Sequence, residues 1–311
     1  MRKRWRIRAG GLLLACCLLN GCSGAGPPAT ESVAKPASAP PIQSEVISAS
    51  PDVRKITFHS ESLGKDMKFN IYLPPGYNAK TKYPVLYALH GYARNEDSWL
   101  PGMEADKTAD RLVKEGRIEP LIIVSPAVDN SYGFNSSDQP AKKPCADCAD
   151  EGRYGDYLTK DLIAYVDAHF STAADRSRRF IGGISMGGWA ALHNSFLHPE
   201  LYSKAGGHSA ALYMEEWFNT GGLRHWMYPI PEMRDWRDPL LLADTEKLEG
   251  LSVYLDCGEQ DNYKFYEGSE LLYRKLKARN IDVQYHLSSG GHDKNYWMPK
   301  MENYLLFYAG K

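Results

Sequence analysis

The chain has 311 residues, of which 43% are hydrophobic and 24% are charged, and its formal net charge is −1 at pH 7. This composition can form a folded core and excludes a disordered or collagen-like chain. Five basic residues lie within residues 1–8, before any acidic residue, and removing them takes the net charge from −1 to −6. A net acidic remainder without a concentrated basic face disfavours nucleic acid as the main partner.

The first 21 residues have the pattern of an export signal. An apolar run of about 11 residues, 9–19, follows the basic ones and is shorter than the roughly 20 residues that a membrane-spanning helix needs. The run ends in Leu19-Asn20-Gly21-Cys22, which resembles the bacterial lipobox, where a small residue precedes a cysteine that is acylated. We therefore expect residues 1–21 to be a lipoprotein signal peptide.

Acylation of Cys22 would anchor the chain to a membrane without a spanning helix. This predicts an exported, membrane-anchored lipoprotein on the extracytoplasmic side. The alternative is an ordinary secreted protein that is cleaved near Gly24 or Ala25.

The segment after the signal predicts a tether. Residues 23–52 hold six prolines and no aromatic residue, so they cannot bury enough surface to fold. We expect residues 22–52 to be a disordered Pro/Ala/Ser-rich linker. The folded domain then comprises residues 53–311, with no second linker and no internal repeat.

Apolar, β-branched and aromatic runs alternate with helical patterns along this domain. Strands are predicted at 54–59, 67–73, 84–90, 119–125, 178–184, 202–207, 251–257 and 281–287, and helices at 155–170, 187–197, 265–279 and 296–308. This alternation is typical of the α/β class, with a mostly parallel sheet covered by helices on both faces. The short link at 61–66 predicts that the sheet opens with an antiparallel hairpin.

The motif Cys145-Ala146-Asp147-Cys148 lies in a polar loop. A C-x-x-C pair can be a redox pair, half of a zinc site or a disulfide. No second pair of metal ligands accompanies it, so we predict no metal site. Because an exported chain meets oxidants, we expect a small structural disulfide between Cys145 and Cys148. Cys257, which ends a predicted strand, is expected to be a buried, inert thiol.

The most informative motif is G-x-S-x-G, present as Gly183-Ile184-Ser185-Met186-Gly187. It follows a predicted strand and precedes a predicted helix, the context of a nucleophile elbow. In such a turn the serine adopts a strained backbone, and the chain passes so close at both flanking positions that only glycine fits. We therefore expect Ser185 to be a nucleophile and Gly183 and Gly187 to be the elbow glycines.

A developing oxyanion needs hydrogen-bond donors. The amide of Met186, at the start of the helix, is one candidate. A second donor usually comes from the loop after the third strand, which here is His90-Gly91-Tyr92. We expect the Tyr92 amide to be this donor and His90 to be structural.

Residues 209–250 lack strong periodicity and are rich in aromatic side chains. An insertion after the sixth strand of this fold commonly forms a small cap over the site. Four aromatic residues are candidates for a substrate pocket: Trp217, Trp226 and Trp236 in the cap, and Tyr132 after the fourth strand. The alternative is a cap that packs only on its own core.

A serine nucleophile needs a general base and an acid that orients it. In folds with a nucleophile elbow, the acid and then the histidine follow the serine in the chain, each at the end of a later strand. His292 lies in a Gly-rich loop after the last strand and is the candidate base. Asp261 is the preferred acid, with Asp256 and Glu259 as alternatives.

Four segments in order resemble one known family: LGKDMKFNIYLPPGYNAKTKYPVLYALHGYARNEDSW, GGISMGGWAAL, YLDCGEQD and GGHDKNYW. The family includes esterase D, S-formylglutathione hydrolase, tributyrin esterases, and feruloyl and acetylxylan esterases. The resemblance covers nearly all of residues 54–308. It implies an α/β-hydrolase fold, hydrolysis of carboxylic esters and no cofactor.

Carried over by position, the resemblance implies that Ser185 is the nucleophile, Asp261 the acid and His292 the base, with the amides of Tyr92 and Met186 as the oxyanion hole. The expected function is a serine esterase that acts on short-chain acyl esters or on acetylated or feruloylated carbohydrates. One alternative is an acyltransferase of the same fold. Another is a binding lipoprotein without catalysis.

Overall fold

The computed structural model describes residues 44–49, 52–138, 149–214 and 222–311. Every described residue belongs to one unit, Ala39–Lys311. Four of the residues singled out from the sequence, Cys22, Cys145, Cys148 and Trp217, lie outside the described residues.

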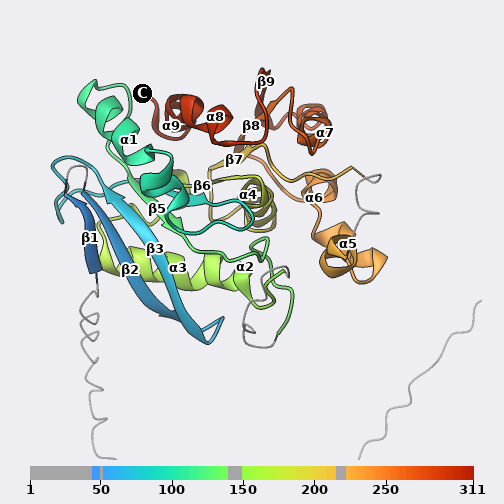
Figure 1. Cartoon of the computed structure of the whole chain (residues 1–311), viewed down its shortest axis with the longest axis horizontal. Helices are drawn as coiled ribbons and strands as arrows, with labels where there is room; N and C mark the ends of the chain where they lie inside the picture. The colour runs from blue at the N-terminus through green and yellow to red at the C-terminus, as the bar shows by residue number, and fades with distance from the viewer. Residues whose placement is uncertain (1–43, 50–51, 139–148, 215–221) are drawn as a thin grey trace, which may run out of the picture. The chain divides into compact units, whose positions relative to one another are not determined.

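A nine-stranded sheet runs through the described part of the chain, in the order β1-β2-β3-β5-β4-β6-β7-β8-β9 (Figure 1). Its strands are β1 (Ser44–Ala49), β2 (Asp52–Ser60), β3 (Lys65–Leu73), β4 (Val85–Leu89), β5 (Ile122–Pro126), β6 (Arg179–Ile184), β7 (Lys204–His208), β8 (Ser252–Gly258) and β9 (Asp282–Ser288). From β5 to β9 in the sheet, neighbouring strands are parallel. All eight strands predicted from the sequence are confirmed within a few residues.

The sheet opens with antiparallel pairs. β2 and β3 form the predicted hairpin, and β3 pairs antiparallel with β5. The structure corrects the predicted start of the fold near Val53, because β1 pairs with β2 from Ser44 onward. The sequence between Pro41 and Pro51 contains no proline and includes Val46 and Ile47, which favour a strand. Composition averaged over residues 23–52, which contain six prolines, does not reveal this short strand.

Helices cover both faces of the sheet, as predicted. The longer helices are α1 (Ala105–Lys114), α3 (Leu162–His169), α4 (Met186–Leu197), α7 (Phe265–Ala278) and α9 (Met301–Ala309). The shorter helices and turns are η1 (Ser98–Gly102), α2 (Tyr154–Asp156), η2 (Tyr157–Asp161), η3 (Arg176–Arg178), α5 (Leu223–Met227), η5 (Pro231–Trp236), α6 (Pro239–Thr245), α8 (Lys294–Trp297) and η6 (Met298–Lys300). The predicted helix at 155–170 is the run from α2 to α3, and the one at 296–308 is divided into α8, η6 and α9.

Two apolar clusters fill the space between sheet and helices. One cluster joins one face of the sheet to α3, α4, α6 and α7, through residues such as Leu162, Trp189, Leu242 and Leu272. The other joins the opposite face to α1 and α9, through residues such as Leu112, Tyr304 and Tyr308. Strands β4 to β8 are almost entirely buried between these layers, as expected for the central strands of a parallel sheet.

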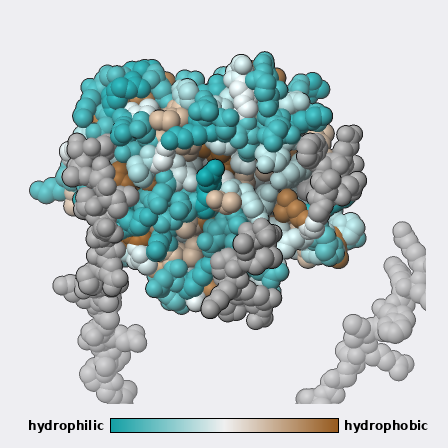
Figure 2. Space-filling view, viewed as in Figure 1, coloured by the Kyte–Doolittle hydropathy of each residue, from teal (hydrophilic) through white to brown (hydrophobic). Residues whose placement is uncertain are grey.

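The sequence did not predict α1, whose ten residues bury only Ala105, Asp106, Ala109 and Leu112. Within the described residues, no helix combines the length and apolar character needed to cross a bilayer. The face in Figure 2 is largely hydrophilic, with hydrophobic residues exposed only in places.

Candidate active site

Ser185 occupies a sharp turn between β6 and α4. Its backbone has φ 57° and ψ −117°, outside the regions that L-residues usually adopt. A Cβ on Gly183 would lie 2.3 Å from the backbone of Gly187, and a Cβ on Gly187 would lie 2.4 Å from the carbonyl oxygen of Leu89. Both flanking positions therefore require glycine, as the sequence predicted. The Ser185 amide donates to the carbonyl of His208 on β7 at 2.9 Å, which fixes the turn to the sheet.

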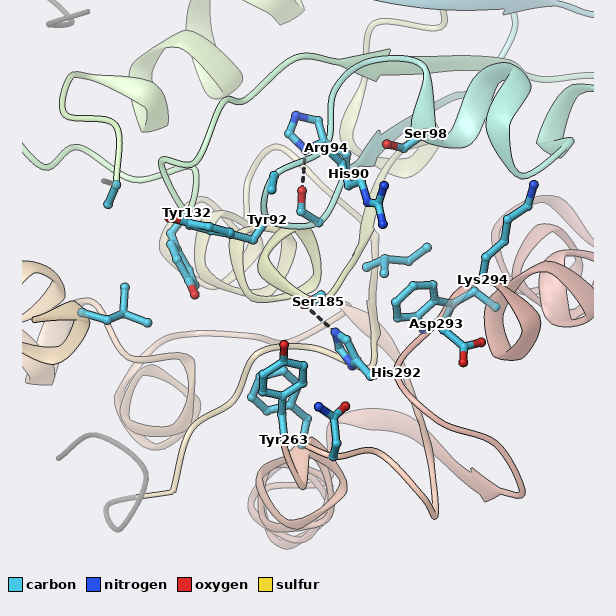
Figure 3. A pocket seen from close by; sticks show the side chains of 18 of the residues that line it. His90, Tyr92, Arg94, Ser98, Tyr132, Ser185, Tyr263, His292, Asp293 and Lys294 are labelled. Carbon is cyan, nitrogen blue, oxygen red and sulfur yellow. Dashed lines mark hydrogen bonds between the residues drawn. The ribbon is translucent and has the colours of Figure 1, made fainter. Parts of the chain in front are cut away.

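Three side chains from three different loops meet at this turn. The Ser185 hydroxyl lies 2.8 Å from Nε2 of His292, in the loop after β9. On the other side of the same ring, Nδ1 lies 2.7 Å from Oδ2 of Asp261, in the loop after β8. The structure thus brings together the predicted nucleophile, base and acid in one chain of hydrogen bonds, of which Figure 3 shows the bond between Ser185 and His292.

The Asp261 carboxylate is buried and fully engaged. Oδ1 accepts a hydrogen bond from the Tyr263 amide at 2.8 Å, while Oδ2 also accepts one from the Cys257 thiol at 3.3 Å. Burial raises the pKa of the Cys257 thiol, so this group stays protonated and acts as a donor. Cys257 is a buried free thiol, as expected.

The two alternative acids lie elsewhere. Asp256 is inside β8 and fully buried, where it accepts hydrogen bonds from His208 Nδ1 and the Tyr304 hydroxyl, each at 2.8 Å. Glu259 is exposed at the surface. Neither carboxylate contacts His292, so Asp261 alone of the three has the geometry of the orienting acid.

The imidazole of His292 is surrounded by aromatic rings. Three rings have their centroids close to that of the imidazole: Tyr263 at 5.0 Å, Phe265 at 5.3 Å and Trp297 at 5.0 Å. The plane of each ring is at a steep angle to the imidazole. Trp297 is fixed in turn because its Nε1 donates to the Ser209 hydroxyl at 3.0 Å. This packing restricts the orientation of the imidazole.

The loop after β4 lies directly against the nucleophile. A Cβ on Gly91 would lie 3.6 Å from Cβ of Ser185, so the loop that carries Tyr92 passes beside the hydroxyl. Met186 is the first residue of α4, where backbone amides are not used within the helix. Both expected oxyanion donors are therefore carried by segments that adjoin Ser185.

His90 is structural in this arrangement. Its Nε2 accepts a hydrogen bond from the Val128 amide at 2.9 Å, so Nδ1 carries the proton and donates to the Gly91 carbonyl at 2.8 Å. Burial lowers the pKa of His90, which favours this neutral form.

An open groove of about 1340 Å³ passes over Ser185 and His292. Aromatic and apolar residues form part of its wall: Tyr132, Tyr213, Leu223, Trp226 and Phe265. Polar and charged residues also contribute to its wall: Arg94, Ser98, Asp293, Lys294 and Asn295. Figure 3 shows Tyr132 on one side of Ser185, with Arg94, Ser98 and Lys294 on the other.

The predicted pocket residues have different outcomes. Tyr132 and Trp226 line the groove, and the Tyr132 hydroxyl lies 3.0 Å from that of Tyr213. Trp236 does not line it, and 56% of its surface is exposed. That prediction was wrong because Trp236 ends the short turn η5, which buries none of its residues.

Several groove residues were missed by sequence reasoning. Tyr263 follows Asp261 by two residues, and Trp297 ends the GGHDKNYW segment that contains His292, so their proximity in sequence could have marked them. The same holds for Arg94, which follows Tyr92 by two residues, whereas Tyr213 has no such signal because only the fold brings its segment to the site. Among the described residues, no group of three or more His, Cys, Asp or Glu side chains is arranged to hold a metal ion.

Comparison with known proteins gives one family match. The family model described as "Putative esterase" matches residues 60–308. An endo-1,4-beta-xylanase/feruloyl esterase of Xylanibacter ruminicola is 34% identical over 245 residues, which cover 77% of this chain and 28% of that protein. An acetyl esterase of Caldicellulosiruptor saccharolyticus is 24% identical over 274 residues, which cover 81% of this chain and 96% of that protein.

Solved structures show the same fold. A ferulic acid esterase has a TM-score of 0.69 and 22% identity, with 83% of this chain and 98% of that chain covered. An S-formylglutathione hydrolase from Staphylococcus aureus has a TM-score of 0.63 and 21% identity, with 82% and 97% covered. The fold shared with these proteins is the α/β-hydrolase fold, as the sequence predicted.

Proposed function

We propose that this chain, a carboxylic-ester hydrolase that belongs to the "Putative esterase" family, acts through Ser185, His292 and Asp261 as a catalytic triad. The observation that carries this proposal is the position of the His292 ring. One ring nitrogen is hydrogen-bonded to the serine hydroxyl and the other to a buried carboxylate.

The first half of the reaction forms an acyl-enzyme. His292 Nε2 takes the proton from Ser185 as its oxygen attacks the ester carbonyl carbon. The amides of Tyr92 and Met186 stabilise the negative charge on the carbonyl oxygen. The carbon–oxygen bond to the alcohol then breaks, and the alcohol leaves with the proton from His292.

The second half returns the free enzyme. Water gives a proton to His292 and attacks the acyl carbon. The bond between this carbon and the Ser185 oxygen then breaks, His292 returns the proton to that oxygen, and the carboxylic acid leaves. Asp261 keeps the proton of His292 on Nδ1, so that Nε2 is the basic nitrogen, and stabilises the imidazolium in both halves.

We propose short-chain acyl esters and acetylated or feruloylated carbohydrates as the substrate classes. The aromatic wall formed by Tyr132, Tyr213 and Trp226 gives a flat acyl group an apolar surface. The names of the relatives, feruloyl esterase and acetyl esterase, support the same classes.

Ester hydrolysis by the wild-type protein and the Ser185→Ala variant tests this function. With p-nitrophenyl acetate, butyrate and octanoate, the variant is expected to lose roughly 10⁴-fold or more in kcat, as loss of a triad member does. Circular dichroism and thermal unfolding of both proteins check that the variant is folded. Equal rates for the two folded proteins would refute the assignment.

We further propose that Cys22 is acylated after removal of residues 1–21 and that the protein is held at a membrane on the extracytoplasmic side. The support for this is the Leu19-Asn20-Gly21-Cys22 sequence at the end of the apolar run.

A further inference from the structure

Arg94 differs from the other arginines in the described part of the chain. It lines the groove over Ser185, yet its guanidinium forms no hydrogen bond and no ion pair within the described residues. The others have partners: for example, Arg111 binds Glu302, Arg179 binds Asp167 and Arg237 binds the Met227 carbonyl. An unpaired guanidinium in a substrate groove has all of its donors available to a ligand.

The position of Arg94 is fixed by the loop that carries it. Its amide donates to the Gly91 carbonyl at 3.2 Å, and the neighbouring Ala93 amide donates to Asn130 Oδ1 at 2.7 Å. The same loop carries Tyr92, so Arg94 follows the expected oxyanion donor by two residues. A group bound by Arg94 therefore belongs to a molecule whose ester lies at Ser185.

Lys294 adds a second positive charge on the same side of Ser185 (Figure 3). It lies two residues after His292 and forms no ion pair within the described residues. The acidic groups nearby are engaged: Asp293 Oδ1 accepts from the amides of Asn295 and Tyr296, and Glu104 is paired with Lys107 at 2.7 Å. Glu151, the other carboxylate on the groove wall, has contacts of its own.

These contacts also indicate which part of the ester is involved. His292 gives its proton to the leaving oxygen, so the alcohol portion must lie beside His292. Lys294 belongs to the same segment, whereas Tyr132 lies on the other side of Ser185 and suits the acyl group (Figure 3). The cationic side of the groove is therefore the alcohol side.

We propose that Arg94, with Lys294 beside it, binds a carboxylate on the alcohol portion of the ester, so that esters of acidic sugars are preferred to esters of neutral ones. This inference rests on the proposed function and names its substrate class more closely. Arg94 provides a planar pair of donors that matches a carboxylate, and Lys294 contributes a point charge. The preference is expected to weaken as salt is added, because the groove is open to solvent.

A matched pair of small esters tests the proposal. 3-Acetoxybenzoate and 3-acetoxybenzamide differ in the charge on the alcohol portion and little in its size. We expect the wild-type kcat/KM to be about tenfold higher for the benzoate at low ionic strength, as for one charge-assisted contact. Arg94→Gln is expected to bring the ratio of the two kcat/KM values close to one, and Arg94→Lys to restore part of it.

Arg274→Gln is the charge-matched control. Arg274 lies on α7, away from the groove lining, and pairs with Glu270 at the surface, so this variant should keep the wild-type ratio. A second experiment compares acetylated xylo-oligosaccharides that carry a uronic acid unit with neutral ones. The wild-type kcat/KM should be higher for the acidic oligosaccharides.

The outcomes separate this proposal from the proposed function. Serine-dependent hydrolysis of both small esters with a ratio that Arg94→Gln leaves unchanged would overturn the carboxylate site and leave the esterase intact. Hydrolysis of neither ester by the folded protein would overturn both.

Discussion

At the scale of the residue, the site depends on one strained backbone. Ser185 is held at φ 57°, and such a conformation costs about 1–3 kcal/mol and persists only where the surroundings impose it. Here the close approach of Gly183 to Gly187 and the bond from the Ser185 amide to His208 impose it. The strain places the hydroxyl within reach of His292 and leaves the start of α4 facing the site.

The Asp261 carboxylate decides which nitrogen of His292 is basic. In Asp261→Asn the amide NH₂ can donate to Nδ1, which moves the ring proton to Nε2 and removes the base. We expect kcat to fall by roughly 10⁴-fold while the fold is retained. Steady-state kinetics with p-nitrophenyl acetate measures this loss. Glu259→Gln, at an exposed position two residues away, should keep wild-type kinetics, and a greater loss in that variant would contradict the assignment.

At the scale of the element, α4 connects the nucleophile to the segment after β7. Its first residue follows Ser185, and near its other end the His193 ring stacks on Trp189 with 4.8 Å between ring centroids. His193 Nδ1 donates to the Arg237 carbonyl at 2.7 Å, which ties α4 to the turn η5. The helix α5, which precedes this turn in the chain, carries the part of the groove wall that includes Leu223 and Trp226.

Protonation of His193 should destabilise the fold, because the cost of burying its charge exceeds what the bond to the Arg237 carbonyl returns. Burial lowers the pKa of His193 from 6.5 to about 4. As the pH falls below 6.5, His193 binds a proton in the unfolded chain but not in the folded protein. The contribution of His193 to the free energy of unfolding is therefore fully present above pH 6.5 and is lost as the pH falls toward 4. The loss attributable to this group is at most about 3 kcal/mol, from 1.36 kcal/mol per pKa unit.

The pH dependence of unfolding tests this expectation. His193→Gln keeps a donor for the Arg237 carbonyl but cannot titrate. The free energy of unfolding, measured by urea denaturation at pH 7 and pH 4.5, should fall less in the variant than in the wild type. Identical pH dependence in the two proteins would show that His193 does not contribute.

At the scale of the whole molecule, we propose different roles for the folded unit and the N-terminal segment. The described sheet starts at Ser44, so the tether that we propose between Cys22 and the domain is shorter than composition indicated. A catalytic domain on such a tether can act on substrates near a membrane surface without being embedded in it.

Cys22→Ser tests the proposed anchoring. In bacterial cells that process lipoproteins, the wild-type protein is expected in the detergent-soluble membrane fraction and to incorporate labelled palmitate. The variant is expected to incorporate none, because a serine hydroxyl does not replace the thiol that is acylated. Equal palmitate labelling of the two proteins would exclude Cys22 as the lipidated residue.

The sequence by itself determined the order of the strands along the chain and the chemistry of the site. The strands and the G-x-S-x-G turn are encoded by neighbouring residues. Hydrophobic periodicity, β-branched side chains and close backbone contacts all act over a few residues. Ser185, Asp261 and His292 could be predicted because each follows a strand whose carboxyl end lies at the same edge of a parallel sheet.

Only the tertiary structure decided the contacts between distant segments. It placed the carboxylate of Asp261, the acid preferred from the sequence, against His292 Nδ1, and left Asp256 and Glu259 without that contact. It also placed Arg94, Tyr213 and Lys294 around one groove and left Trp236 at the surface. These positions depend on how loops from different strands pack together. That packing is set by burial in the assembled fold, and no pattern of neighbouring residues encodes it.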